Sequence, residues 1–335
     1  MKPNIKTISR LTGFSPATVS NALNNKRGVN RATAEKIFQT AREVGYFDGL
    51  KIQRIRLVVY QADGSVVNDS PFFSRLMAGV EAECRRQNLE AVTCHLQKND
   101  PEYHARLTEL LEDGSSALLV LATEMDADEA AKFQRALAPV VILDSWFEEL
   151  EFNAVLIDNT DAAYRAVSYL IERGHTRIGH LRGKMQIKNF YYRRQGYLRA
   201  MTEQGLQPDP KYTFSLSTGM ESACADMARL LAQQPELPTA FFADNDMIAL
   251  GAMRALAQAG VQAPQQVSIV GFDDLPFCAI SSPPLTTVRV YNYEMGQAAV
   301  RRLMEIAGDE NSYRTKTQVA SSFICRDSVR DIRGI

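Results

Sequence analysis

Long apolar runs are absent from this 335-residue sequence: no stretch approaches the roughly 18 to 20 uninterrupted apolar residues of a membrane span. The first residues lead into a polar helical pattern and not into the apolar segment of a secretion signal. We therefore expect a protein that stays in the cytoplasm and has no membrane partner. Its 45% hydrophobic content still allows a large core, and its length suggests two or three folding units.

Motifs that carry catalytic or metal chemistry are also missing. The five cysteines are scattered without a Cys-x-x-Cys pair, and the four histidines have no metal-ligand spacing. The sequence has no Gly-x-Ser-x-Gly elbow, no Walker phosphate loop and no Gly-x-Gly-x-x-Gly dinucleotide fingerprint. We expect reduced, mostly buried thiols, no catalytic residue, no metal and no cofactor.

Charge is divided unevenly along the chain. Residues 1–50 carry eight basic and three acidic side chains, a net charge of +5, whereas the whole chain has a net charge of −1. A basic head on an acidic body is expected when only the head meets a polyanion, because neutralised phosphates release their counterions. A basic face that merely contacts solvent would give the same charge, so both interpretations stay open at this point.

Helix signals fill the first fifty residues. Asn4 can cap a first helix, which Gly13 would end in a left-handed turn. Ser15 can cap a second helix with Pro16 in its first turn, where a missing N–H has no effect. A third helix is expected after Asn30. Three short helices with a tight turn between the first two indicate a helix-turn-helix unit, whose second helix can enter a major groove.

From residue 55 onward, apolar strand-like runs alternate with amphipathic helices, a pattern typical of parallel α/β layers. The expected strands are 55–60, 91–95, 117–121, 139–143 and 154–157, and then, as the pattern restarts, 177–181, 239–243 and 267–271. Two similar halves joined by crossing strands form a cleft, in which ligands bind beyond the carboxyl ends of the strands.

Several segments of the chain resemble one known family. In the head these are ISRLTGFSPATVSNALN at 8–24, TAEKI at 33–37 and VGY at 44–46. In the body they are DN at 158–159, LIERGHTRI at 170–178, DND at 244–246, ALGAM at 249–253, VSIVGFDD at 267–274 and PPLTT at 283–287. Together they closely resemble the lactose and galactose repressor family over nearly the whole chain.

This resemblance implies an α/β protein with a three-helix helix-turn-helix head at residues 1–47, a short linker at 48–54 and an effector-binding and dimerisation domain at 55–335. That domain is expected to be a two-lobed, periplasmic-binding-protein-like sensor with parallel sheets. The first lobe would take about 55–160 and 288–316, and the second about 161–287 and 317–332.

Matching the head to the family's reading positions places Pro16, Ala17 and Asn21 at the base edges. Asn21 can pair bidentately with adenine, while Pro16 and Ala17 offer only apolar contact, for instance to a thymine methyl. Many relatives carry Arg where this chain has Asn21, so we expect a different operator; a plain surface amide is the alternative for Asn21. The side chains suited to DNA phosphates are Thr18, Ser20, Asn24, Lys26 and Arg27.

The linker departs from the family pattern. Relatives usually follow the head with a hinge helix bearing Asn-x-x-Ala-x-x-Leu, whose leucine wedges into the minor groove. Here the first strand begins soon after Tyr46, which leaves no room for two helical turns, and Gly49 would weaken one further. Leu50 or Ile52 could still act as a wedge. We favour the interpretation that they pack the head onto the body, with less bending of the DNA.

Candidate ligand residues lie at strand ends or in the loops that follow them: Phe72, Phe73, Trp146, Asp158, Arg193, Asn245 and Asp273. A sugar offers an apolar ring face to aromatic side chains, and hydroxyls that donate to carboxylates and accept from Arg or Asn. A nucleobase could use the same groups. The aromatic residues could instead be ordinary core, and Arg193 and Asp273 a structural ion pair. Several relatives stack an aromatic residue on the ligand where this chain has Thr218, so the ligand's identity does not carry over.

The leading hypothesis is a homodimeric repressor that binds a double-stranded DNA operator and responds to a small molecule, most simply a sugar, in the cleft. A nucleobase- or nucleoside-responsive regulator is one alternative. A periplasmic solute-binding protein is a second, against which the basic head argues. A third is a sugar- or nucleoside-processing enzyme that would use the carboxylates Asp244, Asp246, Asp273 and Asp274. The absence of a nucleophile, a phosphate loop and a metal cluster argues against that third alternative.

Overall fold

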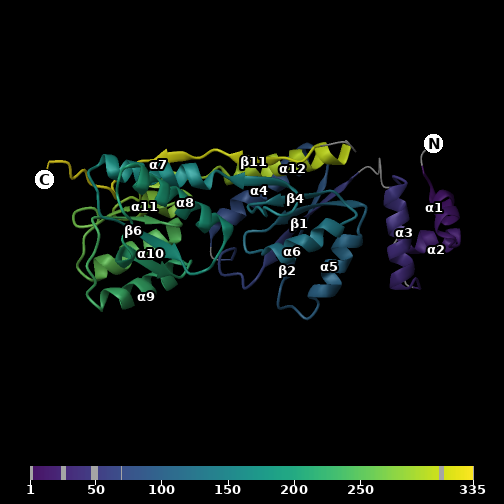
Figure 1. Cartoon of the computed structure of the whole chain (residues 1–335), viewed down its shortest axis with the longest axis horizontal. Coiled ribbons are helices and arrows are strands. Elements are labelled where there is room, and N and C mark those ends of the chain that lie inside the picture. Colours follow the sequence, from purple (N-terminus) through teal and green to yellow (C-terminus); the bar gives the residue numbers. More distant parts are fainter. Residues whose placement is uncertain (1–2, 24–27, 47–51, 69, 309–312, 335) are drawn as a thin grey trace.

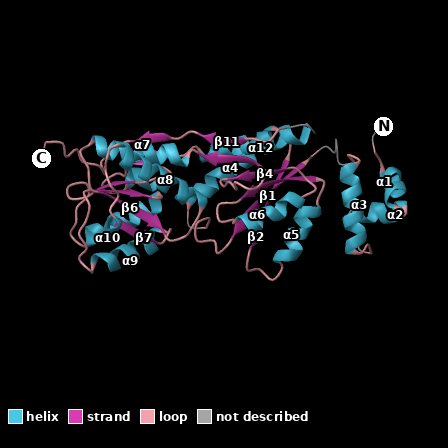
Figure 2. Cartoon of the chain, in the orientation of Figure 1, coloured by secondary structure: helices cyan, strands magenta, loops and turns pink. Residues whose placement is uncertain are grey.

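The computed structural model of the protein describes residues 3–23, 28–46, 52–68, 70–308 and 313–334. Figure 1 shows an elongated molecule, with the N-terminal helices at one end, two α/β lobes along the long axis and the C-terminus at the far end. In Figure 2 the strands lie inside the lobes and the helices around them. These features confirm the expected class: a helical head followed by a two-lobed body with parallel sheets.

The described part of the head folds into three helices, α1 (Ile5–Thr12), α2 (Pro16–Leu23) and α3 (Arg31–Glu43). The predicted caps are present. The side chains of Asn4, Ser15 and Asn30 accept hydrogen bonds from the backbone N–H groups of Thr7, Thr18 and Thr33, at 3.0, 3.0 and 2.8 Å. Gly13 follows α1 with a φ of 77°, the left-handed conformation that only glycine adopts without strain.

The core of the head is small. Its buried residues, contributed by all three helices, are Ile8, Val19, Ala22, Ile37 and Ala41. Their burial on one side leaves Pro16 and Ala17 of α2 exposed on the other. A short amphipathic helix is stable here only because its apolar side packs on two neighbours.

The first lobe contains a parallel sheet in the order β11-β5-β4-β3-β1-β2. Its strands are β1 (Arg54–Gln61), β2 (Glu90–Gln97), β3 (Ser116–Leu121), β4 (Val140–Leu143), β5 (Asn153–Ile157) and β11 (Lys316–Val319). The helices of this lobe are α4 (Pro71–Arg86), α5 (Tyr103–Glu112), α6 (Ala127–Lys132) and α12 (Asn292–Gly308), with a 3-10 turn at Phe133–Arg135. Every residue of β3 is buried, as expected for a central strand covered on both faces.

The second lobe has a parallel sheet in the order β7-β6-β8-β9. Its strands are β6 (Ile178–Gly183), β7 (Thr213–Leu216), β8 (Ala240–Ala243) and β9 (Ser268–Val270). Its helices are α7 (Asn159–Glu172), α8 (Lys188–Glu203), α9 (Met220–Leu231), α10 (Asp246–Gln258) and the short α11 (Phe277–Ile280), with a 3-10 turn at Pro210–Tyr212. A short antiparallel pair, β10 (Thr287–Arg289) and β12 (Ser322–Ile324), accompanies the segments that connect the lobes.

The lobe boundary expected between residues 316 and 317 falls inside β11. This strand pairs in parallel with β5 of the first sheet, in the register Lys316↔Ala154. The return segment of the first lobe therefore continues through Val319. The sequence KTQV has no apolar alternation to assign it to either sheet, and the pairing is decided by α12, which delivers the chain to the free edge of β5.

The end of the linker belongs to the body. Ile52 is buried within the main hydrophobic cluster, which includes first-lobe residues such as Ile55 and Leu57. Because Ile52 is buried in the body, Leu50 is the candidate groove wedge that is left. Gly49 and Leu50 lie outside the described residues. None of the described helices combines the length and the apolar character that a membrane span needs.

Candidate functional site

A cleft between the lobes collects side chains from the carboxyl ends of strands in both sheets. Its lining residues are Val66, Ser70, Phe72, Phe73, Thr123, Asp144, Ile157, Ile187, Asn189, Phe190, Arg193, Asn245 and Asp273. Five predicted ligand residues, Phe72, Phe73, Arg193, Asn245 and Asp273, are thus brought together. Ligands of open parallel sheets usually bind at this location, beyond the carboxyl ends of the strands.

The other two predicted ligand residues do not line this cleft. Trp146 lines a neighbouring pocket, where the ammonium of Lys316 lies 4.4 Å from the centroid of its ring. Asp158 is half-buried between β5 and α7, and its carboxylate lies 3.8 Å from the guanidinium of Arg165. Burial raises the pKa of Asp158, and so does the nearby carboxylate of Asp161.

Local structure at the start of α4 places the two phenylalanines. The Ser70 side chain caps the helix by accepting from the Phe72 N–H at 3.3 Å, and Pro71 occupies the first helical position. The side-chain amide of Asn292 on α12 donates to the carbonyl of Phe72 at 2.9 Å. The rings of Phe72 and Phe73 meet edge to face, with centroids 5.1 Å apart. Both rings are buried in this arrangement.

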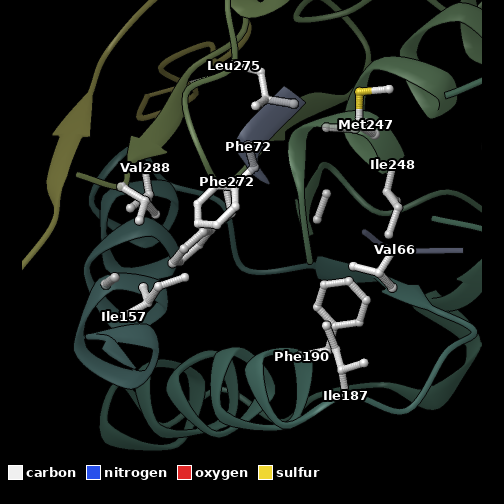
Figure 3. Packing of buried hydrophobic residues seen from close by; sticks show 14 of the residues in the cluster. Val66, Phe72, Ile157, Ile187, Phe190, Met247, Ile248, Phe272, Leu275 and Val288 are labelled. Atoms are coloured by element: carbon white, nitrogen blue, oxygen red, sulfur yellow. The ribbon is translucent and has the colours of Figure 1, made fainter. Parts of the chain in front are cut away.

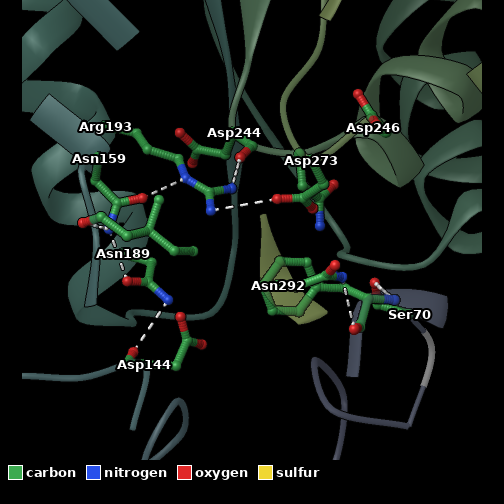
Figure 4. Close-up of polar contacts among 12 residues, drawn as sticks. Ser70, Asp144, Asn159, Asn189, Arg193, Asp244, Asp246, Asp273 and Asn292 are labelled. Atoms are coloured by element: carbon green, nitrogen blue, oxygen red, sulfur yellow. Dashed lines mark hydrogen bonds and ion pairs between the residues drawn. The ribbon is translucent and has the colours of Figure 1, made fainter. Parts of the chain in front are cut away.

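Arg193 is the polar centre of the cleft (Figure 4). The side chain is only 3% exposed. Its guanidinium donates from Nε to Asn159 Oδ1 at 2.9 Å and also to the carbonyl of Asp244. A third nitrogen lies 3.4 Å from Asp273 Oδ1, and the guanidinium stacks 3.7 Å above the ring centroid of Phe272. This planar, multiply bonded cation is preorganised to orient a polar ligand.

Two amides continue the network from Arg193 to the first lobe. Asn159 donates to the side chain of Asn189 at 2.8 Å, and Asn189 donates to the carbonyl of Asp144 at 3.2 Å. Asn189 belongs to α8 of the second lobe, whereas Asp144 directly follows β4 of the first (Figure 4). A change in the lobe angle therefore acts directly on this chain of hydrogen bonds.

Asp144 is a site residue that sequence reasoning missed. Its carboxyl accepts from the Thr123 hydroxyl at 2.6 Å through Oδ2, while Oδ1 is buried without a hydrogen-bond partner among the described residues. Its φ of 64°, like the φ of 121° at Asp273, is one that non-glycine residues rarely adopt. Asp144 follows an apolar strand as directly as Asp273 does, and that pattern could have identified it. Asn189 had no comparable sequence signal.

Burial shapes the ionisation of both carboxyl groups. It raises the pKa of Asp273 to about 8; the guanidinium of Arg193 opposes this shift, and the carboxylates of Asp246 and Asp144 add to it. Burial also raises the pKa of Asp144 to about 6, against the hydrogen bond from Thr123. A ligand hydroxyl group that donates to Asp144 Oδ1 would supply the missing partner.

The raised pKa of Asp273 predicts a pH effect on the ligand-free protein. In an unfolded chain this carboxyl ionises near pH 4, whereas in the fold it ionises near pH 8. Its contribution to stability is complete below the unfolded-state pKa and is lost as the pH rises toward 8, by at most about 1.4 kcal/mol per pH unit. Asp273→Asn removes this loss. The Tm of the variant minus the Tm of the native protein should therefore increase from about pH 6 to about pH 8. A difference that is independent of pH would contradict the raised pKa.

Apolar side chains from both lobes nearly fill the cleft (Figure 3). Val66 of the first lobe lies beside Ile187, which directly precedes α8, and Phe190 of α8, and the open space that remains is about 20 Å³. This is little more than the roughly 10–15 Å³ that one water molecule needs. A ligand the size of a monosaccharide therefore requires the lobes to separate or these side chains to move.

The loop of the first lobe that follows β1 contributes Val66 to the cleft. The carboxylate of Glu124 accepts hydrogen bonds at 2.9–3.1 Å from four backbone N–H groups of this loop, those of Ala62, Gly64, Val66 and Val67. From the second lobe, the Thr218 hydroxyl donates to the carbonyl of Ser65 at 2.7 Å. Thr218 thus links the two lobes in this chain.

Three of the four carboxylates of the enzyme alternative are engaged in structural contacts, whereas the fourth, that of Asp273, lines the cleft. Asp244 is bound by His180 Nε2 at 2.7 Å and by the N–H of Gly183 at 2.8 Å. Asp246 accepts from the Thr287 hydroxyl at 2.6 Å, and Asp274 pairs with Arg289 and Arg326 at 2.7 and 2.6 Å. In the part of the chain that the structure describes, no three His, Cys, Asp or Glu side chains form a metal-binding cluster.

The head presents one face of α2 to solvent. Pro16 and Ala17 are exposed, and Thr18, Ser20 and Asn21 are partly exposed. The hydroxyl of Thr18 lies 2.8 Å from that of Ser15. The remaining phosphate candidates, Asn24, Lys26 and Arg27, lie outside the described residues. The arrangement leaves the predicted base-reading side chains on a face that the head does not use for its own packing.

Comparison with known protein families finds matches for the head and for part of the body. Residues 4–47 match the model for bacterial regulatory proteins of the lacI family, and residues 167–329 match the periplasmic binding protein-like domain. The chain is 30% identical to the HTH-type transcriptional repressor PurR of Aliivibrio salmonicida, over 98% of this chain and 99% of that protein. It is 31% identical to the HTH-type transcriptional repressor CytR of Escherichia coli, over 90% of this chain and 89% of that protein.

A solved structure extends the similarity to three dimensions. The transcriptional regulator CelR in complex with cellobiose superimposes with a TM-score of 0.74 at 26% sequence identity. The match covers 98% of this chain and 100% of that chain.

Proposed function

This chain belongs to the LacI family of bacterial regulatory proteins. On that basis we propose that it is a repressor whose affinity for a DNA operator is controlled by a small molecule bound between its lobes. One observation carries the proposal: a helix-turn-helix head with a free face on α2 is joined to a cleft whose buried carboxyl, Asp144, has an unpartnered oxygen. The head supplies DNA recognition and the cleft supplies control.

For the effector we favour a sugar or sugar derivative. The cleft offers aromatic rings at Phe72 and Phe73, a fixed guanidinium at Arg193 and two carboxyl groups, at Asp144 and Asp273. These groups suit the apolar face and the hydroxyl rim of a sugar ring. The similarity to a regulator solved with cellobiose adds support. A nucleobase or nucleoside is the second candidate, because the same aromatic rings and the amide of Asn189 could hold a planar base.

The remaining parts of the proposal concern assembly and boundaries. The protein would act in the cytoplasm as a homodimer, whose paired heads read a near-palindromic operator. We assign the head to residues 1–47, the linker to 48–54 and the sensor to 55–335, with the first-lobe return segment extended through β11. A ligand can shift the balance between lobe arrangements only by binding one of them more tightly.

Gel shifts with DNA fragments from upstream of the gene that encodes this protein test the function directly. We expect a preference for one fragment that weakens steeply with salt, because phosphate contacts release counterions. A panel of sugars and nucleosides, screened by thermal shift, then identifies the effector. Stabilisation of roughly 2–3 kcal/mol is expected at about a hundredfold excess over Kd. Absence of any salt-sensitive preference, with and without every panel compound, would overturn the proposal.

The base-reading assignment predicts a selective defect in Asn21→Ala. Loss of a bidentate pair to adenine should weaken operator binding by roughly 1–3 kcal/mol and leave binding to random DNA nearly unchanged. Gln39→Ala on α3, which removes an exposed amide that bonds to Glu43, serves as the matched control. Fluorescence anisotropy with operator and random duplexes measures both affinities. Equal weakening on the two duplexes would reduce Asn21 to a positioning role.

A further inference from the structure

A second pocket adjoins the cleft on the side of β11. It is a cavity of about 80 Å³, lined by Ser145, Trp146, Leu156, Ile157, Asn159, Thr160, Lys188, Asn189, Tyr192, Lys316 and Gln318. It shares Ile157 and Asn189 with the cleft but none of the cleft's charged groups. The lining includes two lysines and no acidic residue.

The two lysines differ in their partners. Lys188 lies 2.7 Å from the carboxylate of Glu148, which also accepts from the Tyr192 hydroxyl at 2.6 Å. These contacts hold the pKa of Glu148 down at about 2. Lys316 has no carboxylate within ion-pair distance among the described residues, and its ammonium lies over the ring of Trp146. Partial burial lowers the pKa of Lys316; the nearby carboxylate of Glu148 opposes this shift, and the ammonium of Lys188 adds to it. The two ammonium groups share one nearby carboxylate, so the pocket has a net positive charge.

Two helices begin at this pocket. Asn159 and Thr160 open α7, and Lys188 and Asn189 open α8. Neither helix has a side chain that caps its first N–H groups. The positive ends of two long helices, of 14 and 16 residues, thus meet beside the two ammonium groups.

Ser145 provides an independent indication of a ligand. The residue is only 2% exposed and lines the pocket, yet its hydroxyl has no hydrogen-bond partner among the described residues. A buried hydroxyl without a partner costs about 1–3 kcal/mol, so native proteins rarely retain one without a reason. Beside two lysines, the partner that such a donor fits is an oxygen carrying negative charge.

We infer that this pocket binds a phosphate-sized oxyanion, held by Lys316, Lys188 and Ser145. The open volume accommodates several water molecules and therefore a tetrahedral group. Because the pocket meets the cleft at Asn189, two sources share this chemistry: free phosphate, or a phosphate ester whose remainder occupies the cleft. The second source rests on the proposed function of the cleft. In either case the anion touches the amide that links Asp144 to the Arg193 network.

Calorimetric titration of the full-length protein with inorganic phosphate, at an ionic strength held constant with chloride, tests the proposal. We expect saturable binding that weakens at least tenfold in Lys316→Gln and in Ser145→Ala. Lys98→Gln, which changes an exposed first-lobe lysine paired with Asp126, should bind phosphate as the native protein does. Without phosphate, Lys316→Gln should keep the native Tm because Lys316 is exposed, and Ser145→Ala should keep or raise it because the variant loses a buried hydroxyl without a partner.

A second arm distinguishes the sources by comparing glucose with glucose 6-phosphate and adenosine with AMP. A phosphate ester that binds at least tenfold more tightly than its neutral parent, and loses that advantage in Lys316→Gln, identifies the ester as the ligand. Saturable binding of inorganic phosphate, without tighter binding of either ester than of its neutral parent, identifies the free anion as the ligand. The proposal fails if no anion binds better than chloride, or if both pocket variants bind phosphate as the native protein does. Because no DNA is present, that failure would leave the operator proposal standing.

Discussion

Arg193→Ala is expected to abolish the response to the effector while the head keeps its affinity for the operator. In the native protein this guanidinium joins Asn159, the carbonyl of Asp244 and Asp273 in one buried group. Its removal takes away the cation that orients a ligand and leaves Asp273 buried without a partner. Because burial raises the pKa of Asp273 to about 8, this carboxyl is largely neutral at pH 7, and leaving it without its partner typically costs about 1–3 kcal/mol. Gel shifts with increasing effector measure the response, and thermal unfolding measures the loss of stability.

A second variant separates the loss of function from the loss of stability. Arg193→Met combined with Asp273→Asn replaces both partners of the Arg193–Asp273 contact, so neither stays buried without the other. We expect it to recover most of the stability lost in Arg193→Ala, because removing both partners of a buried pair is often close to neutral. It should remain unresponsive to the effector. A normal response in either variant would show that the Arg193 network is structural and that the effector binds elsewhere.

Ile8→Ala is expected to unfold the head and to lower operator affinity by about two orders of magnitude or more. Ile8 is fully buried, and the described part of the head has only a handful of buried hydrophobic residues. Truncating a buried isoleucine typically costs about 2–5 kcal/mol, and a domain of this size has little stability to lose. The body has its own clusters, which do not include Ile8, so effector binding and the main unfolding transition should not change.

Leu11→Ala on the same helix is the matched control. Its side chain is 55% exposed, so the same kind of truncation creates no cavity. Changes at such surface positions are usually within about 0.5 kcal/mol. Circular dichroism in the near and far ultraviolet follows the unfolding transition of the head in the two variants. Fluorescence anisotropy measures their affinity for the operator. Native operator affinity in Ile8→Ala would show that the three-helix head is not the DNA-binding part.

Several features followed from short stretches of sequence. Asn4, Gly13, Ser15 and Asn30 were recognised as helix boundaries because a cap depends on backbone groups three or four residues away. The alternation of apolar runs and amphipathic helices predicted the parallel sheets, since burial on both faces demands apolar residues in every position. Arg193, Asn245 and Asp273 were placed together because parallel strands bring their carboxyl ends to one edge.

Other features depend on contacts between distant parts of the chain. The pairing of β11 with β5 joins segments about 160 residues apart, and KTQV contains no pattern that selects one sheet over the other. Asn189 reaches the carbonyl of Asp144, 45 residues away, only because both lobes are packed as they are. Trp146 and Asp158 follow strands as the cleft residues do, yet they point to other surroundings.

By itself the sequence determined the helix-turn-helix head, the parallel two-lobed body and part of the cleft, because each depends on local propensity or on the edge to which a strand runs. The tertiary structure alone decided which polar groups meet between the lobes and which are left without partners. Asp144 and Ser145 are adjacent in the chain, yet one faces the cleft and the other the lysine-lined pocket. Burial and the distances to groups on the other lobe set their chemistry, and those quantities exist only once the lobes are packed together.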